Sequence, residues 1–296
     1  MFDLRYHVAS LAAVFFALVI GILVGVALAS HGLGNSERRS LQDDVRRAQN
    51  RADALKTRFD ALTQSSTADH TFVENTYSAL MADRLKGKRI AVLFVGSADH
   101  RVQNAITGSL DDASGAALRI YSVQVPIDDT AVSKRLSKRP FLASYAGDDQ
   151  LKNLGKALGE EFVAGNEAPL WKALQTLIVQ EAHPRFGKSK RPADGVIVVR
   201  TADPQTWPTA PFLQGLYAGL TDAGVPAVGV AASADAFTAR PVFQEAGLST
   251  VDDVDTLAGK LALVVLLAGP AAQADYGTKV EKLLPAVPPV TTTTGG

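Results

Sequence analysis

The side chains able to bind a transition metal or attack a substrate are few in this sequence and lie far apart. The chain has no cysteine, its two methionines are Met1 and Met81, and no two of its five histidines lie within one helical turn of each other. Soft Cu(I) prefers thiolate and thioether ligands, and structural zinc sites need clustered cysteine or histidine. We therefore expect no thiol chemistry, no tight Cu(I) site inside one subunit, and no metal site from histidine spacing. The histidines are His7, His31, His70, His100 and His183.

Two other segments carry polar residues of interest, and each also has a structural interpretation. The turn Gly96-Ser97-Ala98-Asp99 follows a predicted strand, but it holds one glycine where a dinucleotide-binding fingerprint has three. We expect it to be an ordinary strand-to-helix turn with Ser97 or Asp99 as the helix cap. Three acids further on fit either a cation site or the first turn of a helix, where the helix dipole favours acids, and we favour the helix. These acids are Asp252, Asp253 and Asp255.

A basic loop is the last candidate. Its side chains either remain solvated or contact an anionic lipid or a cell-wall polymer, and solvation is the simpler interpretation. Neither a Gly-x-Ser-x-Gly turn nor a Walker motif occurs in the chain. Without a nucleophile or a cofactor turn, we expect a protein that is not an enzyme and that has no cofactor. The loop contains Phe186 and the basic residues Arg185, Lys188, Lys190 and Arg191.

The composition limits the class of protein further. The chain has 296 residues, 47% of them hydrophobic, with 30 basic residues balanced by 30 acidic ones. This apolar fraction supports a packed core, and the zero net charge disfavours broad binding to nucleic-acid phosphates. We therefore expect a folded protein with no nucleic-acid partner.

An N-terminal membrane anchor is predicted at residues 1–30. The 23 residues between His7 and His31 carry no charge, and as a helix they would span about 35 Å, enough for a hydrocarbon core of roughly 30 Å. The alternative is a cleaved signal peptide ending at Ala27-Leu28-Ala29, but its apolar stretch would be longer than usual. Small residues recur every four positions on one face of the helix, which favours close helix packing and self-association. They are Ala13, Ala17, Gly21, Gly25 and Ala29.

A helical neck is predicted at residues 31–87. Seven apolar or small residues follow one another with spacings of 4-3-4-3-4-3, which is typical of a coiled-coil seam. Directly after a membrane helix, this seam favours a parallel homodimer stalk, and the alternative is one amphipathic helix lying on its own domain. We expect Ser65-Ser66-Thr67 to interrupt the helix and a second helical stretch to end near Gly87. The seam residues are Leu41, Val45, Ala48, Ala52, Leu55, Phe59 and Leu62.

An α/β domain is predicted at residues 88–284, because short apolar runs alternate there with helical patterns. This alternation indicates a Rossmann-like parallel sheet with helices on both faces. We expect two helices between Asp149 and Gln180, the second opened by Pro169, and a helix over 251–268 with a capping box at Thr250 and Asp253. The Pro- and Thr-rich end, 285–296, is predicted to be a disordered tail. Strands are expected at 90–95, 118–125, 196–199 and 226–231. Further helices are expected over about 211–223 and in a segment that carries Val102, Ile106 and Leu110.

Three segments together resemble the actinobacterial copper-transporter family. They are MFDLRYHVASLAAVFFALVIGILVGVAL at the start, GLSTVDDVDTLAGKLALVVLLAG at 247–269, and Asp275-Tyr276-Gly277. The resemblance covers essentially the whole chain in order. It implies an envelope protein with an N-terminal anchor and an extracytoplasmic soluble domain, whereas the arginines that follow the helix would by themselves favour a cytoplasmic one. No catalytic or metal-binding motif carries over from the family to residues of this chain.

The resemblance implies two different roles. Mycobacterial members imply copper homeostasis or export that limits intracellular copper, and a corynebacterial member implies a membrane partner in a complex that regulates peptidoglycan cleavage during cell separation. One dry membrane helix per subunit could line a channel only as an oligomer. We therefore expect an envelope protein with a role in copper homeostasis, and we keep a scaffold that controls a peptidoglycan hydrolase as the alternative.

Overall fold

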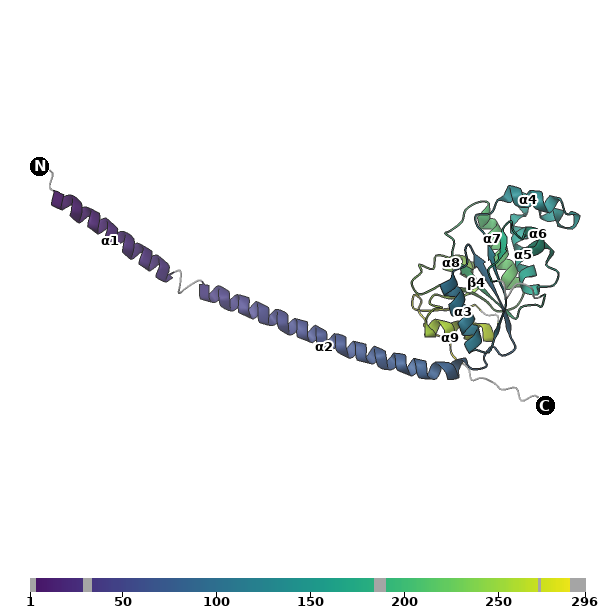
Figure 1. Ribbon diagram of the computed structural model, residues 1–296, viewed down its shortest axis with the longest axis horizontal. Coiled ribbons are helices and arrows are strands. Elements are labelled where there is room, and N and C mark those ends of the chain that lie inside the picture. The colour runs from purple at the N-terminus through teal and green to yellow at the C-terminus, as the bar shows by residue number, and fades with distance from the viewer. Residues whose placement is uncertain (1–3, 29–33, 184–189, 271–272, 288–296) are drawn as a thin grey trace. The chain divides into compact units, whose positions relative to one another are not determined.

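The computed structural model describes residues 4–28, 34–183, 190–270 and 273–287 (Figure 1). The chain divides into two compact units, Met1–Thr71 and Phe72–Gly296. The first unit holds helix α1, Leu4–Leu28, and most of helix α2, Gly34–Met81. The second unit holds the end of α2 and the α/β domain.

Helix α1 contains the segment Ala9–Leu28, which has a mean hydropathy of 2.9. By length and composition it could cross a membrane, since about 20 apolar residues span a hydrocarbon core. Its described side chains from residue 9 onward are exposed. The apolar helix predicted at the N-terminus is therefore present.

Helix α2 runs without interruption for 48 residues, so the expected break at Ser65-Ser66-Thr67 is wrong. Serine and threonine lower helix propensity only slightly, and neither proline nor glycine occurs between residues 35 and 81. The hydroxyls of Thr63, Thr67 and Thr71 each donate to the carbonyl four residues earlier, at 2.8 to 2.9 Å, which satisfies them within the helix. The helix ends at Met81 and a turn follows, so the expectation of a helix to Gly87 is also wrong.

The α/β domain contains one seven-stranded sheet in the order β3-β2-β1-β4-β5-β6-β7. All neighbouring strands are parallel except β3, which is antiparallel to β2. The central strand β1 pairs Val92 with Ile120 on one side and with Ile197 on the other. This sheet confirms the predicted Rossmann-like α/β fold. Its strands are Arg89–Val95 (β1), Ala116–Val123 (β2), Val179–Glu181 (β3), Gly195–Arg200 (β4), Ala227–Val230 (β5), Ser249–Val251 (β6) and Asp275–Tyr276 (β7).

Helices cover both faces of the sheet (Figure 1). One core cluster lies under α3 and α9 and includes Met81 at the end of α2, and the other lies under α5 and α7. Tyr77 Oη donates to Asp112 at 2.9 Å, which joins the end of α2 to α3. The helices of the domain are His100–Asp112 (α3), Asp129–Ser137 (α4), Leu151–Ala164 (α5), Pro169–Leu174 (α6), Thr209–Asp222 (α7), Arg240–Glu245 (α8) and Leu257–Ala268 (α9), with short 3₁₀ turns at Pro140–Tyr145 and Asp148–Gln150.

Helices α5 and α7 approach each other through glycines on both sides of their contact. A Cβ atom placed at Gly159 would lie 2.5 Å from the carbonyl oxygen of Leu216 and 2.9 Å from the nitrogen of Leu220. Cβ atoms at Gly155, Gly215 and Gly219 would also overlap main-chain atoms of the facing helix. The two helix backbones are therefore packed directly against each other, with no side chain between them.

Two expectations for the domain need correction. The helix expected over 251–268 begins only at Leu257, and its cap is Thr256, whose hydroxyl accepts the N–H of Gly259 at 3.0 Å. Thr250 is instead in strand β6, where its hydroxyl donates to Asp275 at 2.6 Å. Between residues 149 and 180 the helices α5 and α6 are present, and α6 begins at Pro169 as expected, but strand β3 follows at Val179.

Part of the predicted C-terminal tail lies outside the described residues, which end at 287. Val287 itself packs against the core cluster under α3 and α9.

Candidate functional site

The membrane-helix stripe lies on α1 as predicted from its spacing. A Cβ atom at Gly21 or Gly25 would meet no atom of another segment within 4 Å among the described residues of the first unit. Ala13 and Ala17 are likewise exposed, and Ala29 lies outside the described residues. The stripe is available for packing, and its partner stays a prediction.

The seam residues all lie on helix α2 and all are exposed. The five large ones expose between 55% and 70% of their surface. They are Leu41, Val45, Leu55, Phe59 and Leu62, and the small members are Ala48 and Ala52. Among the residues that the structure describes, the first unit gives this apolar row no cover of its own. The parallel coiled coil and the single amphipathic helix lying on its own domain both stay predictions.

The crevice where nucleotides bind in Rossmann folds lies at the carboxyl ends of β1 and β4, where the strand order reverses. Asp99 Oδ1 accepts the N–H groups of Arg101 at 2.7 Å and Val102 at 3.2 Å, so Asp99, one of the two residues expected as the cap, is the N-cap of α3. A pyrophosphate would need these same N–H groups. A Cβ at Gly96 would lie 2.7 Å from Thr201 Oγ1, and at a φ of 104° this position requires glycine for the turn itself. The crevice residues therefore do not fit a dinucleotide.

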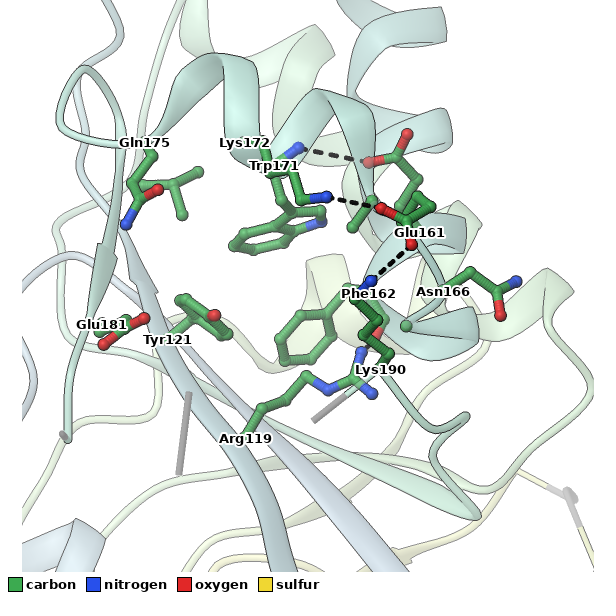
Figure 2. Close-up of a pocket in the computed structure, with 14 residues that line it drawn as sticks. Arg119, Tyr121, Glu161, Phe162, Asn166, Trp171, Lys172, Gln175, Glu181 and Lys190 are labelled. Atoms are coloured by element: carbon green, nitrogen blue, oxygen red, sulfur yellow. Dashed lines mark hydrogen bonds and ion pairs between the residues drawn. The ribbon is translucent and has the colours of Figure 1, made fainter. Parts of the chain in front are cut away.

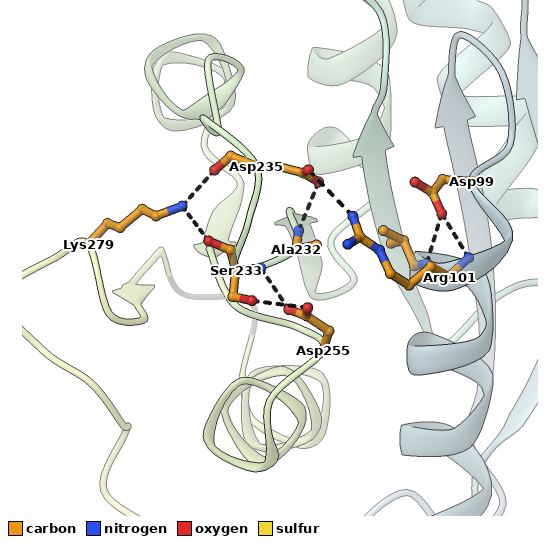
Figure 3. Close-up of polar contacts among 8 residues, drawn as sticks. Asp99, Arg101, Ala232, Ser233, Asp235, Asp255 and Lys279 are labelled. Atoms are coloured by element: carbon orange, nitrogen blue, oxygen red, sulfur yellow. Dashed lines mark hydrogen bonds and ion pairs between the residues drawn. The ribbon is translucent and has the colours of Figure 1, made fainter.

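A polar network holds the loop after β5 beside this crevice (Figure 3). Asp255 accepts the N–H of Ser233 at 2.7 Å and its hydroxyl at 3.0 Å, and Lys279 donates to the carbonyl oxygens of Ser233 and Asp235. Arg101 lies 3.5 Å from Asp235. Hydrogen bonding to Ser233 lowers the pKa of Asp255 below its usual range, although burial acts in the opposite direction. The network joins four segments of the chain: the start of α3, the loop after β5, the residues before α9 and the segment that contains Lys279.

The three acids at 252–255 are not the first-turn acids of a helix, because α9 begins only at Leu257. Asp252 is fully buried, forms an ion pair with Arg240 and accepts the N–H of Lys279 at 3.0 Å. Asp253 is also fully buried, and neither of its carboxylate oxygens has a hydrogen-bond partner within the described part of the chain. Burial and the nearby charge of Asp252 raise the pKa of Asp253. Each acid thus has its own surroundings, because strand β6 places the segment in the core before the helix begins.

A pocket of about 270 Å³ lies between strands β2 and β3 and the segment joining α5 to α6 (Figure 2). Three aromatic rings from three elements line it. The ring centroids of Tyr121 and Trp171 are 5.2 Å apart, and those of Phe162 and Trp171 are 5.1 Å apart. The indole N–H of Trp171 donates to the carbonyl of Leu158 at 2.8 Å, which fixes the ring against α5. The rings give the pocket a rigid apolar wall.

Charged groups surround these rings. Glu167 accepts from Lys172 at 2.8 Å and from Lys190 at 2.5 Å, and these two ammonium groups lower its pKa to about 2. Glu161 accepts the N–H groups of Leu170 at 2.9 Å and Trp171 at 3.2 Å. Burial raises the pKa of Glu161, and these two N–H groups act against that rise.

Sequence reasoning missed this pocket. Tyr121 and Arg119 belong to a segment interpreted only as a strand, and Trp171 belongs to one interpreted only as a helix. An arginine inside an apolar strand, Leu118-Arg119-Ile120, was the available signal, because a buried cation needs polar partners. Of the predicted basic loop, Lys190 lines the pocket and Arg191 is described, whereas Arg185, Phe186 and Lys188 lie outside the described residues.

Metal-binding geometry is not found in the described ranges, which contain no group of three or more histidine, cysteine, aspartate or glutamate side chains placed to hold an ion. His31 lies outside these ranges.

Comparison with known proteins places the chain in a family. Residues 1–285 match the family model described as "Copper transport outer membrane protein, MctB". The chain belongs to the MctB family. The predicted resemblance to a copper-transporter family is thereby confirmed.

Curated relatives named "Copper transporter MctB" come from Mycobacterium bovis and from two strains of Mycobacterium tuberculosis. Each is 30% identical to this chain over 123 residues, which is 42% of the chain and 38% of the relative. The matched segment is thus well under half of the length of these curated relatives.

Proposed function

We propose that this protein is a single-pass envelope protein that contributes to copper homeostasis or export, with its α/β domain outside the cytoplasm. The observation that carries the proposal is the match of residues 1–285 to the MctB family model. An apolar helix at Ala9–Leu28, long enough to cross a membrane, supports the anchored topology.

The contribution to copper handling is proposed to come from contacts with other molecules, not from catalysis or tight coordination of Cu(I). The chain lacks cysteine and has only two methionines, so the soft ligands that Cu(I) prefers are scarce. A channel built from one membrane helix per chain would need several copies side by side. Assembly is therefore central to the proposal.

We further propose that two copies pair in parallel through the seam of α2. A row of large apolar side chains that is 55–70% exposed in one chain gains stability when a second row covers it. The continuous helix supports an unbroken stalk, because α2 continues beyond the seam through Ser65-Ser66-Thr67 to Met81. The small-residue face of α1 could extend the pairing into the membrane.

A deletion strain of the native host tests the copper role. We expect it to accumulate copper and to grow poorly at raised copper concentration, and we expect the intact gene to restore both properties. A second complementation with Leu55→Asp asks whether the seam is needed. Normal copper content and normal copper tolerance in the deletion strain would overturn the proposal.

The second candidate is a membrane-anchored scaffold that controls a peptidoglycan hydrolase. The exposed seam supports this class of function as well, since a row of exposed apolar side chains is typical of a surface that binds another protein. The same deletion strain distinguishes the two candidates when its septa are imaged. Chained, unseparated cells with ordinary copper tolerance would favour the scaffold.

A further inference from the structure

The aromatic pocket beside β2 separates its charges onto two sides. Figure 2 shows Glu181 on one side with Tyr121, and Lys190 and the head group of Arg119 on the other side near Phe162. The ring centroids of Tyr121 and Phe162, which lie between these groups, are 6.3 Å apart. The pocket therefore has an acidic side and a basic side, with an apolar wall between them.

Arg119 is the buried cation of the basic side. Only 5% of its surface is exposed. One terminal nitrogen donates to the carbonyl of Phe162 at 2.7 Å and the other to the carbonyl of Arg191, while Nε has no hydrogen-bond partner within the described residues. Two main-chain carbonyls do not neutralise a guanidinium, and burying a charge without a counterion is costly. An anionic group of a ligand would supply the missing charge.

The remaining charges nearly cancel. Lys172 and Lys190 both lie against the carboxylate of Glu167. Glu161 also lines the pocket, and its hydrogen bonds to the N–H groups at the start of α6 leave its negative charge in place. Three cations therefore face two carboxylates, which leaves one net positive charge on the basic side. On the other side, Glu181 is exposed, and its charge contributes to the raised pKa of Tyr121. It is placed to attract an ammonium group that also lies against an aromatic ring.

We propose that this pocket binds a short zwitterionic peptide, of dipeptide size. Its carboxylate would face Arg119 and Lys190, its ammonium group would face Glu181, and its apolar body would lie against Tyr121 and Trp171. An apolar cavity of about 150 Å³ holds benzene, so the volume here suits about ten to twelve non-hydrogen atoms. A free α-amino acid has its two charges too close together to reach both sides, because one residue spans at most about 3.6 Å. This inference does not depend on the copper role.

Trp171 provides a direct assay, because the chain has only one other tryptophan, Trp207. The full-length protein with Trp207→Phe, in detergent, is titrated with L-alanyl-L-alanine while its fluorescence is recorded. We expect a saturable change with a Kd below about 1 mM, a modest affinity for a ligand of this size. The N-acetylated and C-amidated dipeptides each lack one charge, and we expect them to bind at least about fivefold more weakly. L-Alanine tests the requirement for separated charges, and we expect no saturation with it.

Glu181→Gln tests the acidic side with little risk to folding, because Glu181 is exposed. We expect it to raise the Kd for the dipeptide about threefold to tenfold, because the attraction to the ammonium group is lost while the contacts of the peptide's carboxylate remain. Glu281→Gln, the same change at an exposed position outside the pocket, should leave the Kd unchanged. Lys190→Gln tests the basic side without disturbing the buried Arg119, and it should also weaken binding.

No saturable signal up to about 10 mM dipeptide, with circular dichroism showing a folded protein, would overturn the proposal. Equal affinity for the dipeptide and its N-acetylated, C-amidated form would do the same, because the pocket would then select by shape and not by charge.

Discussion

Replacing Gly159 with alanine would push helices α5 and α7 apart. The added Cβ would lie 2.5 Å from the carbonyl oxygen of Leu216, whereas ordinary contact begins at 3.4 Å, so the helices must separate by about 0.9 Å (3.4 − 2.5). The opposing atoms are main chain and cannot rotate away. Because α5 also carries Glu161 and Phe162, the same movement would disturb the aromatic pocket.

The size of the effect follows from two opposing contributions. A gap of 0.5 to 1 Å forfeits about a quarter to a half of each dispersion contact, and overpacking in a core costs about 1–3 kcal/mol. Because the strain falls on the backbone, we expect the upper end, about 3 kcal/mol. Alanine recovers about 1 kcal/mol of helix propensity relative to glycine. The net loss in the free energy of unfolding should therefore be about 2 kcal/mol.

Urea denaturation of the full chain in detergent measures this loss through tryptophan fluorescence. Trp171 and Trp207 both belong to the α/β domain, so the signal is independent of α1 and most of α2. A loss of about 2 kcal/mol lowers the urea midpoint by roughly 1 M. Gly108→Ala is the matched control, because a Cβ at Gly108, also in a helix, would meet no atom within 4 Å. It should stabilise the domain by about 0.5–1 kcal/mol.

The comparison of the two variants removes the propensity contribution and isolates the clash. If Gly159→Ala were as stable as the parent, or matched Gly108→Ala, the close approach of α5 and α7 would be refuted.

Three further predictions concern the cap, the seam and a buried acid. Asp99→Ala removes the acceptor of two N–H groups at the start of α3 and should cost about 1 kcal/mol in urea denaturation, whereas Asp111→Ala near the end of the same helix should change stability by less than about 0.5 kcal/mol. Leu55→Asp should shift the particle measured by light scattering from dimer to monomer, and Lys56→Asp, off the seam, should leave a dimer; equal masses for both variants would reject the stalk. Asp253 has a raised pKa when folded, so the folded state binds its proton more tightly and wild-type stability falls as pH rises from the ordinary 3.8 through the raised value. Asp253→Asn should therefore gain stability over the wild type that is small near pH 4 and larger at pH 7, and a gain independent of pH would show that the carboxylate is not strained.

The outline of the α/β domain was predictable because its strands are continuous apolar runs. Val92 and Ile197 lie in adjacent central strands that are buried on both faces, and such continuous apolar runs can be recognised from the sequence alone. The two short edge strands cannot be recognised in this way. Val179–Glu181 and Asp275–Tyr276 have three and two residues, too few to show a period, and they form only because a neighbouring strand offers unpaired backbone groups.

The same limit explains the misplaced start of α9. Thr250-x-x-Asp253 has the spacing of a capping box, but the pairing of Thr250 with Asp275 places it in the sheet, and Thr256 takes the cap. The hydrogen bond to a residue 25 positions away therefore prevented the local capping motif from forming. The pocket was missed for a related reason, since Tyr121 is in a strand that is distant in the sequence from the two helices that carry Phe162 and Trp171.

The sequence by itself determined the features that depend on the pattern along one segment: the uncharged run of α1, the 4-3 row of seam residues on α2, the buried central strands, and a helix cap at either Ser97 or Asp99. Each of these rests on interactions within a few residues or on the burial preference of single side chains. Only the tertiary structure decided the sheet order, the glycine contact of α5 with α7, the separate surroundings of Asp252, Asp253 and Asp255, and the charged aromatic pocket. Those features depend on which distant segments meet, and the free energy that selects their contacts comes from packing in three dimensions.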